Sequence, residues 1–282
     1  MKELENIKSR RSVRTFKPEG IDDKTLKVIQ DIVSKKWVGP FGKSYNFTLI
    51  NLNDENIKEL GNLTSYGVIK GANLYLAGSS ESDDRSIIDY GYCFEKIILD
   101  LNREGISTCW LGGTFGRGFV ANALGLESGF IVPAITPIGI KEDKSSITEK
   151  LVRTIAQSNK RLDDEKIFFI VEDNLVLPAI WEGLNSKLKG LLEAVKYAPS
   201  ASNKQPWRIL VEFNAIHLFW DKNEKYNASM KNFNIQALDM GIALAHIDSV
   251  AKDEGLKGSF VEKYPDINES DWIYINSWVR YL

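Results

Sequence analysis

The stretch Ala198-Pro199-Ser200-Ala201-Ser202-Asn203-Lys204-Gln205-Pro206-Trp207 combines small residues, two prolines and two side-chain amides. It separates a helical pattern from an apolar run, 208–211, that has strand propensity. The apolar residues of the helical pattern are Leu188, Leu191, Leu192 and Val195. Backbone N–H groups and hydroxyls are free to meet a ligand at such a junction, so the stretch predicts a binding loop. A plain surface turn is the alternative interpretation.

The composition is that of a globular protein with a large core. The chain has 282 residues, of which 43% are hydrophobic, and this length suggests one or two domains. The 36 Lys and Arg against 38 Asp and Glu give a net charge of −2. No global field therefore draws the chain to nucleic acid or to an anionic membrane, and any anion site must be local.

The N-terminal residues and the scattered cysteines and histidines exclude several classes. Residues 1–8 carry charges where a signal peptide needs an apolar core, and no apolar run of about 18 residues occurs, so we expect a cytoplasmic protein. The two cysteines form no C-x-x-C motif and are expected to be buried thiols. The two histidines lack partners at metal-ligand spacing, so no metal site is predicted.

A basic segment lies near the N-terminus. Residues 9–16, Ser-Arg-Arg-Ser-Val-Arg-Thr-Phe, place three guanidinium groups and three hydroxyls within eight positions. Arginine binds phosphate oxygens in a bidentate manner, and the alternation in the segment directs Ser12 and Arg14 to one side. The segment predicts an anion site, with a solvated basic turn as the alternative.

Glycines follow a long apolar helix that begins near Asp84. Gly105 to Gly113 reads as a helix end, a short strand and a glycine pair that lets a flat ligand approach the backbone. Residues 116–121 match the dinucleotide-binding pattern G-x-G-x-x-A, but the order of strand, helix and acidic residue is missing, so we interpret the match as accidental. Residues 131–140 predict a strand, at a sheet edge because of Pro133 and Pro137.

The second half repeats the plan of the first. Lys43–Phe47 matches Asn203–Trp207 at an offset of 160, each after a helix and before a strand. The long helix recurs at an offset of 150, through the pairs Asp89 and Asp239, Gly91 and Gly241, Glu104 and Glu254, and Gly105 and Gly255. Residues 127–128 match 269–270 at an offset of 142. The matches predict a duplicated unit, shortened in its second copy, with accidental similarity as the alternative.

Each copy lacks what the other carries. Acids occupy the second copy where the basic segment would fall, and the first copy has Val38–Lys43 where Ala198–Asn203 would fall. We therefore expect an intrachain pseudo-dimer of residues 1–165 and 166–282, with one working site between the halves and a monomeric chain.

These motifs resemble the nitroreductase family of flavoproteins, and the tandem arrangement resembles its single-chain branch, the TM nitroreductases. The resemblance implies an α+β nitroreductase-like fold with central, mostly antiparallel sheets flanked by helices, and a tightly bound FMN. It implies that thirteen residues contact the FMN. Arg10, Arg11, Ser12, Arg14, Lys160 and Arg161 would hold the phosphate; Pro199, Ser200, Ala201 and Asn203 would line the flavin and its ribityl chain; Gly112 and Gly113 would address flavin N5, and Ser65 the pyrimidine edge.

The resemblance also implies the activity. An FMN-dependent oxidoreductase would take hydride from NAD(P)H and reduce a nitro, quinone or similar acceptor by a ping-pong cycle, with no catalytic side chain because the chemistry occurs on the flavin. Tyr226, Met230 and Phe233 are candidates for a pocket wall, with ordinary packing as the alternative. Reductive dehalogenation, consumption of the flavin, a non-catalytic FMN sensor and a scaffold without a ligand are the other functions that the pattern leaves open.

Overall fold

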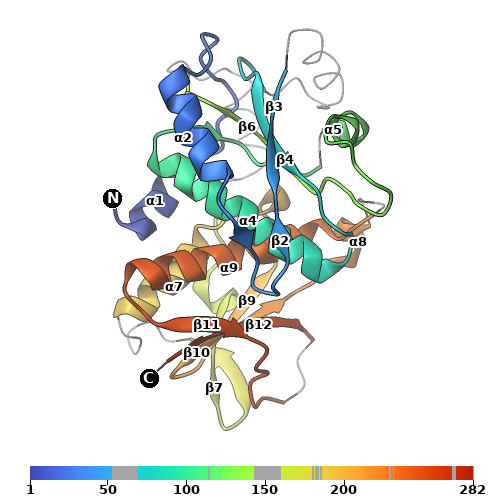
Figure 1. Ribbon diagram of the computed structural model, residues 1–282. Helices are drawn as coiled ribbons and strands as arrows, with labels where there is room; N and C mark the ends of the chain where they lie inside the picture. Colours follow the sequence, from blue (N-terminus) through green and yellow to red (C-terminus); the bar gives the residue numbers. More distant parts are fainter. Residues whose placement is uncertain are drawn as a thin grey trace.

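The computed structural model describes residues 1–281 except 53–68, 114, 143–159, 180, 182–183, 185, 229, 231 and 269–270 (Figure 1). Up to residue 142 the elements are α1 (Glu3–Ser9), α2 (Asp23–Val33), β1 (Trp37–Val38), β2 (Ser44–Tyr45), β3 (Phe47–Asn51), β4 (Leu74–Gly78), α4 (Asp84–Arg103), β5 (Ser107–Thr108), α5 (Arg117–Ala123) and β6 (Ile135–Gly139). From residue 160 they are η1 (Asp164–Lys166), β7 (Phe168–Glu172), β8 (Leu175–Pro178), α7 (Ser186–Lys196), η3 (Ala201–Asn203), β9 (Trp207–Val211), β10 (Ala215–Trp220), α8 (Glu224–Asn227), α9 (Ile235–Asp253), β11 (Gly258–Val261) and β12 (Ile273–Arg280).

Two separate sheets form from the two parts of the chain. The first has the order β3-β4-β6-β5, and the second has the order β11-β12-β10-β9-β7-β8. Among the described strands of these sheets, only β7 and β9 pair in parallel. The prediction of an α+β fold with mostly antiparallel sheets is confirmed.

The two sheets share one topology. Strands β9, β10, β12 and β11 of the second sheet follow the same order as β3, β4, β6 and β5 of the first. Along the chain, α4 lies between β4 and β5, and α9 lies between the corresponding strands β10 and β11. The hairpin β7–β8 extends the second sheet beyond this common core. The common order supports the duplication that the sequence matches indicate.

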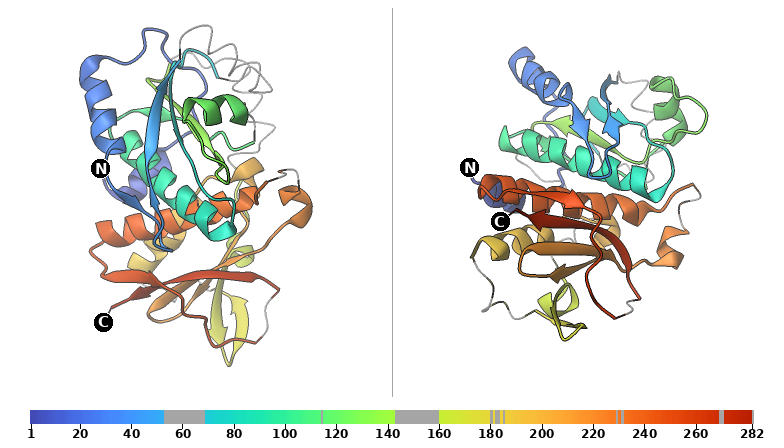
Figure 2. Two further views of the ribbon diagram at one scale, coloured as in Figure 1. Left: turned by 45° about the vertical axis from the view of Figure 1, so that its right-hand side comes forward. Right: turned by 60° about the horizontal axis from the view of Figure 1, so that its bottom comes forward.

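Helices α4 and α9 pack against each other between the two sheets (Figure 2). They meet at the two glycines of the repeat: a Cβ on Gly241 would lie 2.1 Å from the Ile88 carbonyl oxygen, and a Cβ on Gly91 would lie 2.5 Å from the Leu238 carbonyl oxygen. Only glycine permits such an approach of two helix backbones. The helix contact is therefore fixed by the same residue type at corresponding positions.

The burial of α9 follows from this central position. All of its residues from Ile235 to Ala251 are buried, because α4 covers one side and α7 and the second sheet cover the others. Asp83 is the N-cap of α4, and its carboxylate accepts a hydrogen bond from the Ser86 N–H at 3.0 Å. The buried face of α4 carries Tyr90 and Phe94, which stack with ring centroids 5.5 Å apart.

Strand β6 corrects one prediction. The two prolines of residues 131–140 predict an edge strand, but β6 lies between β4 and β5. Pro137 is opposite Tyr75 of β4, and on the other side β5 ends at Thr108, which is opposite Ile138. The next N–H of that chain, from Cys109, donates to the Thr136 hydroxyl at 2.9 Å. A proline is tolerated inside this sheet because the ladder beside it is interrupted at Pro137 and resumes only where Leu111 pairs with Ile135.

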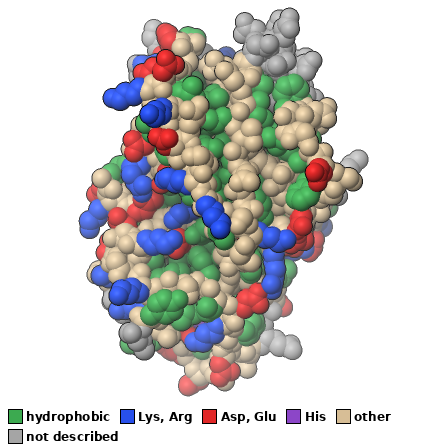
Figure 3. Space-filling view, viewed as in Figure 1, with side chains coloured by type: hydrophobic (Ala, Val, Ile, Leu, Met, Phe, Trp, Pro, Cys, Tyr) green, Lys and Arg blue, Asp and Glu red, His purple; other side chains and the backbone are tan. Residues whose placement is uncertain are grey.

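The surface and the helices agree with the composition. Acidic and basic side chains are interspersed on the face shown in Figure 3, as the small net charge requires. In the part of the chain that the structure describes, no helix combines the length and the apolar character needed to cross a membrane.

Candidate functional site

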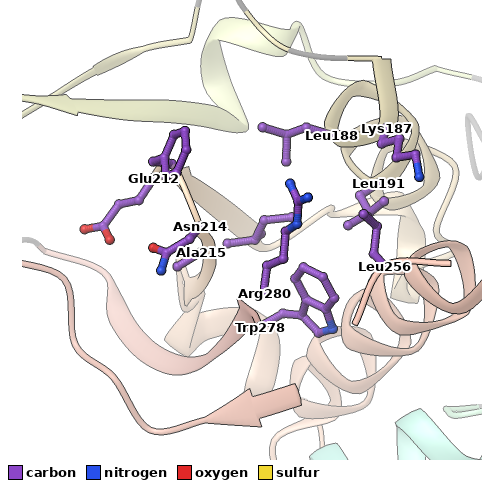
Figure 4. Close-up of a pocket in the computed structure, with 11 residues that line it drawn as sticks. Lys187, Leu188, Leu191, Glu212, Asn214, Ala215, Leu256, Trp278 and Arg280 are labelled. Atoms are coloured by element: carbon purple, nitrogen blue, oxygen red, sulfur yellow. The ribbon is translucent and has the colours of Figure 1, made fainter. Parts of the chain in front are cut away.

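A cavity of about 300 Å³ opens between the two halves of the chain, within the size range of small-molecule sites. Its lining comes from Arg10, Ser12, Arg14, Trp110, Gly112, Gly113, Arg161, Pro199, Ser200, Ala201, Ser202, Asn203, Tyr226, Ile235, Leu238, Asp239 and Ile242. A hollow between α7 and the ends of β10 and β12, shown in Figure 4, holds only about 30 Å³, roughly the volume of one water molecule. Of these two spaces, only the first has room for a cofactor.

The Arg10 guanidinium is a buried cation with unused hydrogen-bonding capacity. Arg10 ends α1, where its backbone N–H donates to the Asn6 carbonyl at 3.1 Å. Its side chain is 8% exposed, and its Nε lies 3.9 Å from Oε1 of the fully buried Glu95. Its Nη1 is buried without a hydrogen-bond partner among the described residues. A buried donor of this kind is costly unless a ligand meets it.

Glu95 connects the cavity to both long helices. One of its oxygens is 3.0 Å from His246 Nε2 on α9, and the other accepts from Trp110 Nε1 at 2.7 Å. His246 is also 2.7 Å from the Ala194 carbonyl through Nδ1. Because a carbonyl only accepts, Nδ1 carries a proton, which fixes the ring. This network holds Arg10 and the cavity residue Trp110 in place.

Several cations converge at the same end of the cavity. Burial lowers the pKa of Arg161, and the charges of Arg10 and Arg11 lower it further. Arg161 Nη1 donates to Asn203 Oδ1 at 2.9 Å. Like charges gathered with little solvent repel one another, and an anion bound among them relieves the repulsion. The structure therefore brings Arg10 and Arg161, which are 151 positions apart in the sequence, into one anion-attracting cluster.

Backbone pairing places Ser12 and Arg14 beside this cluster. The Val13 N–H donates to the Thr108 carbonyl at 2.9 Å, and the Lys70 N–H donates to the Arg14 carbonyl at 2.8 Å. Val13 is buried while Ser12 and Arg14 line the cavity. The alternation in the sequence thus directs the two polar side chains to one side, as predicted.

The loop between α7 and β9 is held in an uncommon conformation. Ser202, Asn203 and Gln205 have φ values of 48°, 54° and 49°, and a left-handed residue other than glycine costs about 1 kcal/mol. Side-chain contacts stabilise it: Asn203 Nδ2 donates to the Lys160 carbonyl at 2.7 Å, and Gln205 Oε1 accepts from the Leu162 N–H at 3.0 Å. Such conformations collect at functional sites.

The glycine pair is fixed by the guanidinium of Arg117. This side chain donates to the carbonyls of Gly112, Val132 and Pro133, and it lies 4.6 Å from the ring centre of Phe115 and 5.5 Å from that of Phe233. Burial lowers its pKa. Because a trans peptide directs C=O and N–H to opposite sides, the Gly113 N–H points away from Arg117.

Arg117 lies in the G-x-G-x-x-A match, where Gly116 precedes α5. The strands on either side of this helix, β5 and β6, are antiparallel. The parallel βαβ unit of a dinucleotide site is therefore absent from this part of the described chain. The match contributes a residue that orders the glycine pair, not a phosphate-binding turn.

Ten of the thirteen predicted site residues line the cavity, two do not, and one lies outside the described residues. Arg11 is exposed and donates to the carbonyls of Lys8 and Arg10. Lys160 contributes its carbonyl oxygen to the loop, whereas its exposed side chain is outside the lining. Ser65 lies outside the described residues. Of the proposed wall, Tyr226 lines the cavity, and its hydroxyl donates to Ser202 Oγ at 2.9 Å. Met230 and Phe233 are not part of the lining.

The sequence interpretation missed the contribution of α9. Asp239 lines the cavity with the apolar residues Ile235, Leu238 and Ile242. Asp239 is one of two buried acids in a largely apolar helix, and this was the available signal, because a charged side chain is rarely buried without a role.

The fold and the family follow from comparison with known proteins. A solved structure described as a putative nitroreductase from Thermotoga maritima covers 99% of this chain and 94% of its own, at 19% identity and a TM-score of 0.60. The fold is thus nitroreductase-like. The model of the family described as "Putative TM nitroreductase" matches residues 3–251, and the chain belongs to this family. The resemblance to the nitroreductase family that the sequence motifs indicated is confirmed.

Smaller nitroreductases match about half of the chain. An FMN-dependent nitroreductase from Clostridium difficile covers 50% of this chain and 88% of its own, at 19% identity and a TM-score of 0.42. A nitroreductase with bound FMN from Bacteroides fragilis covers 51% and 91%, at 18% identity and a TM-score of 0.41. None of the curated proteins matches the sequence. Membership in a nitroreductase family supports an oxidoreductase activity in general terms.

Proposed function

We propose that the cavity binds one FMN and that the protein is an FMN-dependent oxidoreductase. The observation that carries the proposal is the unsatisfied Nη1 of the buried Arg10, beside the partly buried Arg161. A phosphate monoester carries about two negative charges and several acceptor oxygens, which fit this cluster. Arg10, Ser12, Arg14 and Arg161 would hold the phosphate, with Arg11 and Lys160 adding charge from outside the lining.

The remaining lining suits a flat, partly apolar ring system. Ile235, Leu238 and Ile242 offer an apolar wall, and Pro199, Ser200, Ala201 and Asn203 form the loop opposite the basic segment. Gly112 and Gly113 present backbone without side chains, so that a ring can approach closely. Ser65 remains a proposed contact to the pyrimidine edge.

Bound FMN supplies the hydride chemistry, with NAD(P)H as the proposed donor and a nitro, quinone or similar small molecule as acceptor in a ping-pong cycle. The protein's part is to bind, to orient and to exclude water. Arg117 fixes the Gly112–Gly113 peptide that faces the ring, and Tyr226, hydrogen-bonded to Ser202, forms the edge over which donor and acceptor would enter. No side chain is proposed as a catalytic acid or base.

The same geometry supports one site per chain. Residues 1–165 supply the basic segment and the glycine pair, and residues 166–282 supply the loop and the apolar wall. The contact between α4 and α9 would replace the interface of two separate subunits, so we propose a monomeric chain with an internal pseudo-two-fold axis. Sedimentation of a stable dimer would contradict this proposal.

Flavin titration tests the function. The purified protein should quench FMN fluorescence at a one-to-one ratio and bind riboflavin more weakly, because riboflavin lacks the phosphate. Anaerobic mixing with NADH and with NADPH should then bleach the bound flavin with at least one donor. Absence of FMN binding would overturn the proposal. Binding without bleaching by either donor would favour a non-catalytic flavin sensor instead.

A further inference from the structure

Two buried aspartates occupy corresponding places on the long helices, Asp89 on α4 and Asp239 on α9. Both accept a hydrogen bond from a loop of their own half, which is the turn between β1 and β2 for Asp89 and the loop between α7 and β9 for Asp239. The donors are the N–H groups of Phe41 and Ala201, which also correspond in the repeat at the offset of 160. Asp89 and Asp239 therefore show the same carboxyl group in two different hydrogen-bonding environments.

In the first half, the loop satisfies both carboxylate oxygens. Asp89 Oδ1 accepts from the Phe41 N–H at 2.9 Å, and Oδ2 accepts from the Lys43 N–H at 3.0 Å. Gly39 closes over the side chain so tightly that a Cβ there would lie 2.1 Å from Asp89 Cγ. No room is left for a ligand beside this carboxylate.

In the second half, one oxygen is left over. Asp239 Oδ1 accepts from the Ala201 N–H at 2.9 Å. Asn203 is the counterpart of Lys43, but its N–H donates to the Ser200 carbonyl at 3.0 Å. Asp239 Oδ2 is buried without a hydrogen-bond partner among the described residues, in a side chain that is 2% exposed and lines the cavity.

The setting of Asp239 favours the neutral acid. Burial raises the pKa of Asp239 well above its usual range, and the Ala201 N–H offsets only part of this effect. Asp89, with a second N–H and the Lys43 charge nearby, has a pKa raised only to about 6. The side chains beside Asp239 in the lining, Ile235, Leu238 and Ile242, provide no charge to stabilise a carboxylate. A protonated carboxyl has one O–H to donate.

We propose that Asp239 binds the ligand of the cavity directly, as a neutral carboxylic acid that donates a hydrogen bond from Oδ2 to an uncharged acceptor atom of the flavin. This inference rests on the proposed FMN function and adds a contact from the second half to the cations of the first. The ligand would occupy the space that the loop itself fills beside Asp89.

Substitutions at the two aspartates test the contact by FMN fluorescence titration. Asp239→Asn keeps an oxygen for the Ala201 N–H and an N–H for the ligand, so it should bind FMN within about threefold of the wild type. Asp239→Leu removes both groups at similar volume and should weaken binding about tenfold. The matched variants Asp89→Asn and Asp89→Leu should leave FMN affinity unchanged.

The pH dependence distinguishes a donating acid from an accepting carboxylate. The other titratable groups of the lining are Arg10, Arg14, Arg161 and Tyr226, and burial raises the pKa of Tyr226. On α4, the nearest buried acid, Glu95, is held by Trp110 and by His246 of α9, and it is unchanged in every variant. The FMN phosphate titrates at about pH 6 with the wild type and the variant alike, so the affinity of the wild type is compared with that of Asp239→Asn at each pH. This ratio should fall as pH rises through the pKa of Asp239. A ratio that rises with pH, or an equal loss in the Asn and Leu variants, would overturn the inference.

Thermal unfolding of the ligand-free protein gives a second measurement that does not need FMN. A raised pKa in the folded state means that wild-type stability relative to Asp239→Asn is greatest below about pH 4 and declines as pH rises toward the folded pKa. A difference in melting temperature that is flat from pH 4 to 9 would show an ordinary carboxylate and refute the neutral acid. If the wild type binds no FMN, the proposed function fails whatever this measurement gives. If it binds FMN and the variants behave alike, the inference alone fails.

Discussion

The loop Gly39–Lys43 of the first half folds onto Asp89 and closes the space beside it, whereas its counterpart Pro199–Asn203 leaves a cavity beside Asp239. The first loop joins the paired strands β1 and β2, the second joins α7 to β9, and both donate an N–H to a buried aspartate. They differ in the second N–H, which reaches the carboxylate in one loop and a backbone carbonyl in the other. This one hydrogen bond therefore distinguishes a loop that is packed against its aspartate from a loop that leaves a cavity beside it.

The basic segment shows the opposite asymmetry. Arg10, Ser12 and Arg14 line the cavity from the first half, and the second half supplies acidic residues at the corresponding place in the sequence. One half keeps the cations and the other keeps the open loop. Because the contact between α4 and α9 brings them together, a duplicated chain can hold one complete site where two equal subunits would hold two.

The largest effect should come from the helix contact on which both halves depend. Gly241→Ala places a Cβ 2.1 Å from the Ile88 carbonyl oxygen, so α4 and α9 must separate. We expect a loss of about 3 kcal/mol or more in the free energy of unfolding. Guanidinium denaturation, followed by circular dichroism, measures it.

Gly118→Ala is the matched control for the helix contact. Gly118 lies in α5, and a Cβ there meets nothing within 4 Å. Alanine should leave the stability unchanged or raise it by up to about 1 kcal/mol, because it is the better helix former. Equal denaturation midpoints for Gly241→Ala and the wild type would show that the two halves are not held together as described.

The next largest effect should separate the phosphate end of the site from the ring end. Arg10→Ala removes a buried charged donor and should weaken FMN binding about 100-fold, since hydrogen bonds to charged groups contribute about 1.5–3 kcal/mol. Riboflavin binding should change little. Arg11→Ala, which removes an exposed guanidinium bonded to backbone carbonyls, should cost only a few-fold. A similar loss for FMN and riboflavin in Arg10→Ala would place the phosphate elsewhere.

A smaller effect should appear at the glycine pair. Arg117→Met keeps the apolar length of the side chain but removes the donors to the carbonyls of Gly112, Val132 and Pro133. We expect about tenfold weaker binding of both FMN and riboflavin, because the ring-facing backbone loses its order. The control Arg85→Met removes a guanidinium that stacks on Phe41 of the closed loop, and it should change neither affinity. Selective loss of FMN alone in Arg117→Met would contradict this role.

Much of the fold could be predicted from local patterns and from the repeat. The helical period and the caps at Asp22 and Asp83 place the helices, and the offset of 150 identifies the two that pack together. The position of β6 could not be predicted. Pro137 has no N–H, and this keeps a strand out of the sheet interior only where the neighbouring strand offers a carbonyl that the N–H would have to bond. Strand length is set by the whole sheet, not by the proline.

The site could be predicted where a residue type has a specific chemistry. Ten of the predicted positions, arginines and small loop residues among them, line the cavity, although they come from segments far apart in the sequence. The exclusion of the Lys160 side chain depends on where the chain turns after 160, and the role of Asp239 depends on which N–H the loop directs toward it. Both are outcomes of tertiary packing that no local pattern encodes.

The last prediction concerns how the stability of the protein depends on pH through Asp89 of the closed loop alone. Asp89 has a pKa of about 6 because burial raises it, while the N–H groups of Phe41 and Lys43 lower it in part. An acid with a raised folded pKa stabilises the protein fully below its unfolded pKa near 4, loses this contribution as pH rises to about 6, and is constant above. Relative to Asp89→Asn, the wild type should therefore lose about 2 kcal/mol between pH 4 and 7, or roughly 4–8 °C in melting temperature. The difference should flatten above pH 6, whereas that between wild type and Asp239→Asn should keep declining. Parallel curves for the two pairs would mean that the open and closed loops hold their aspartates in the same state.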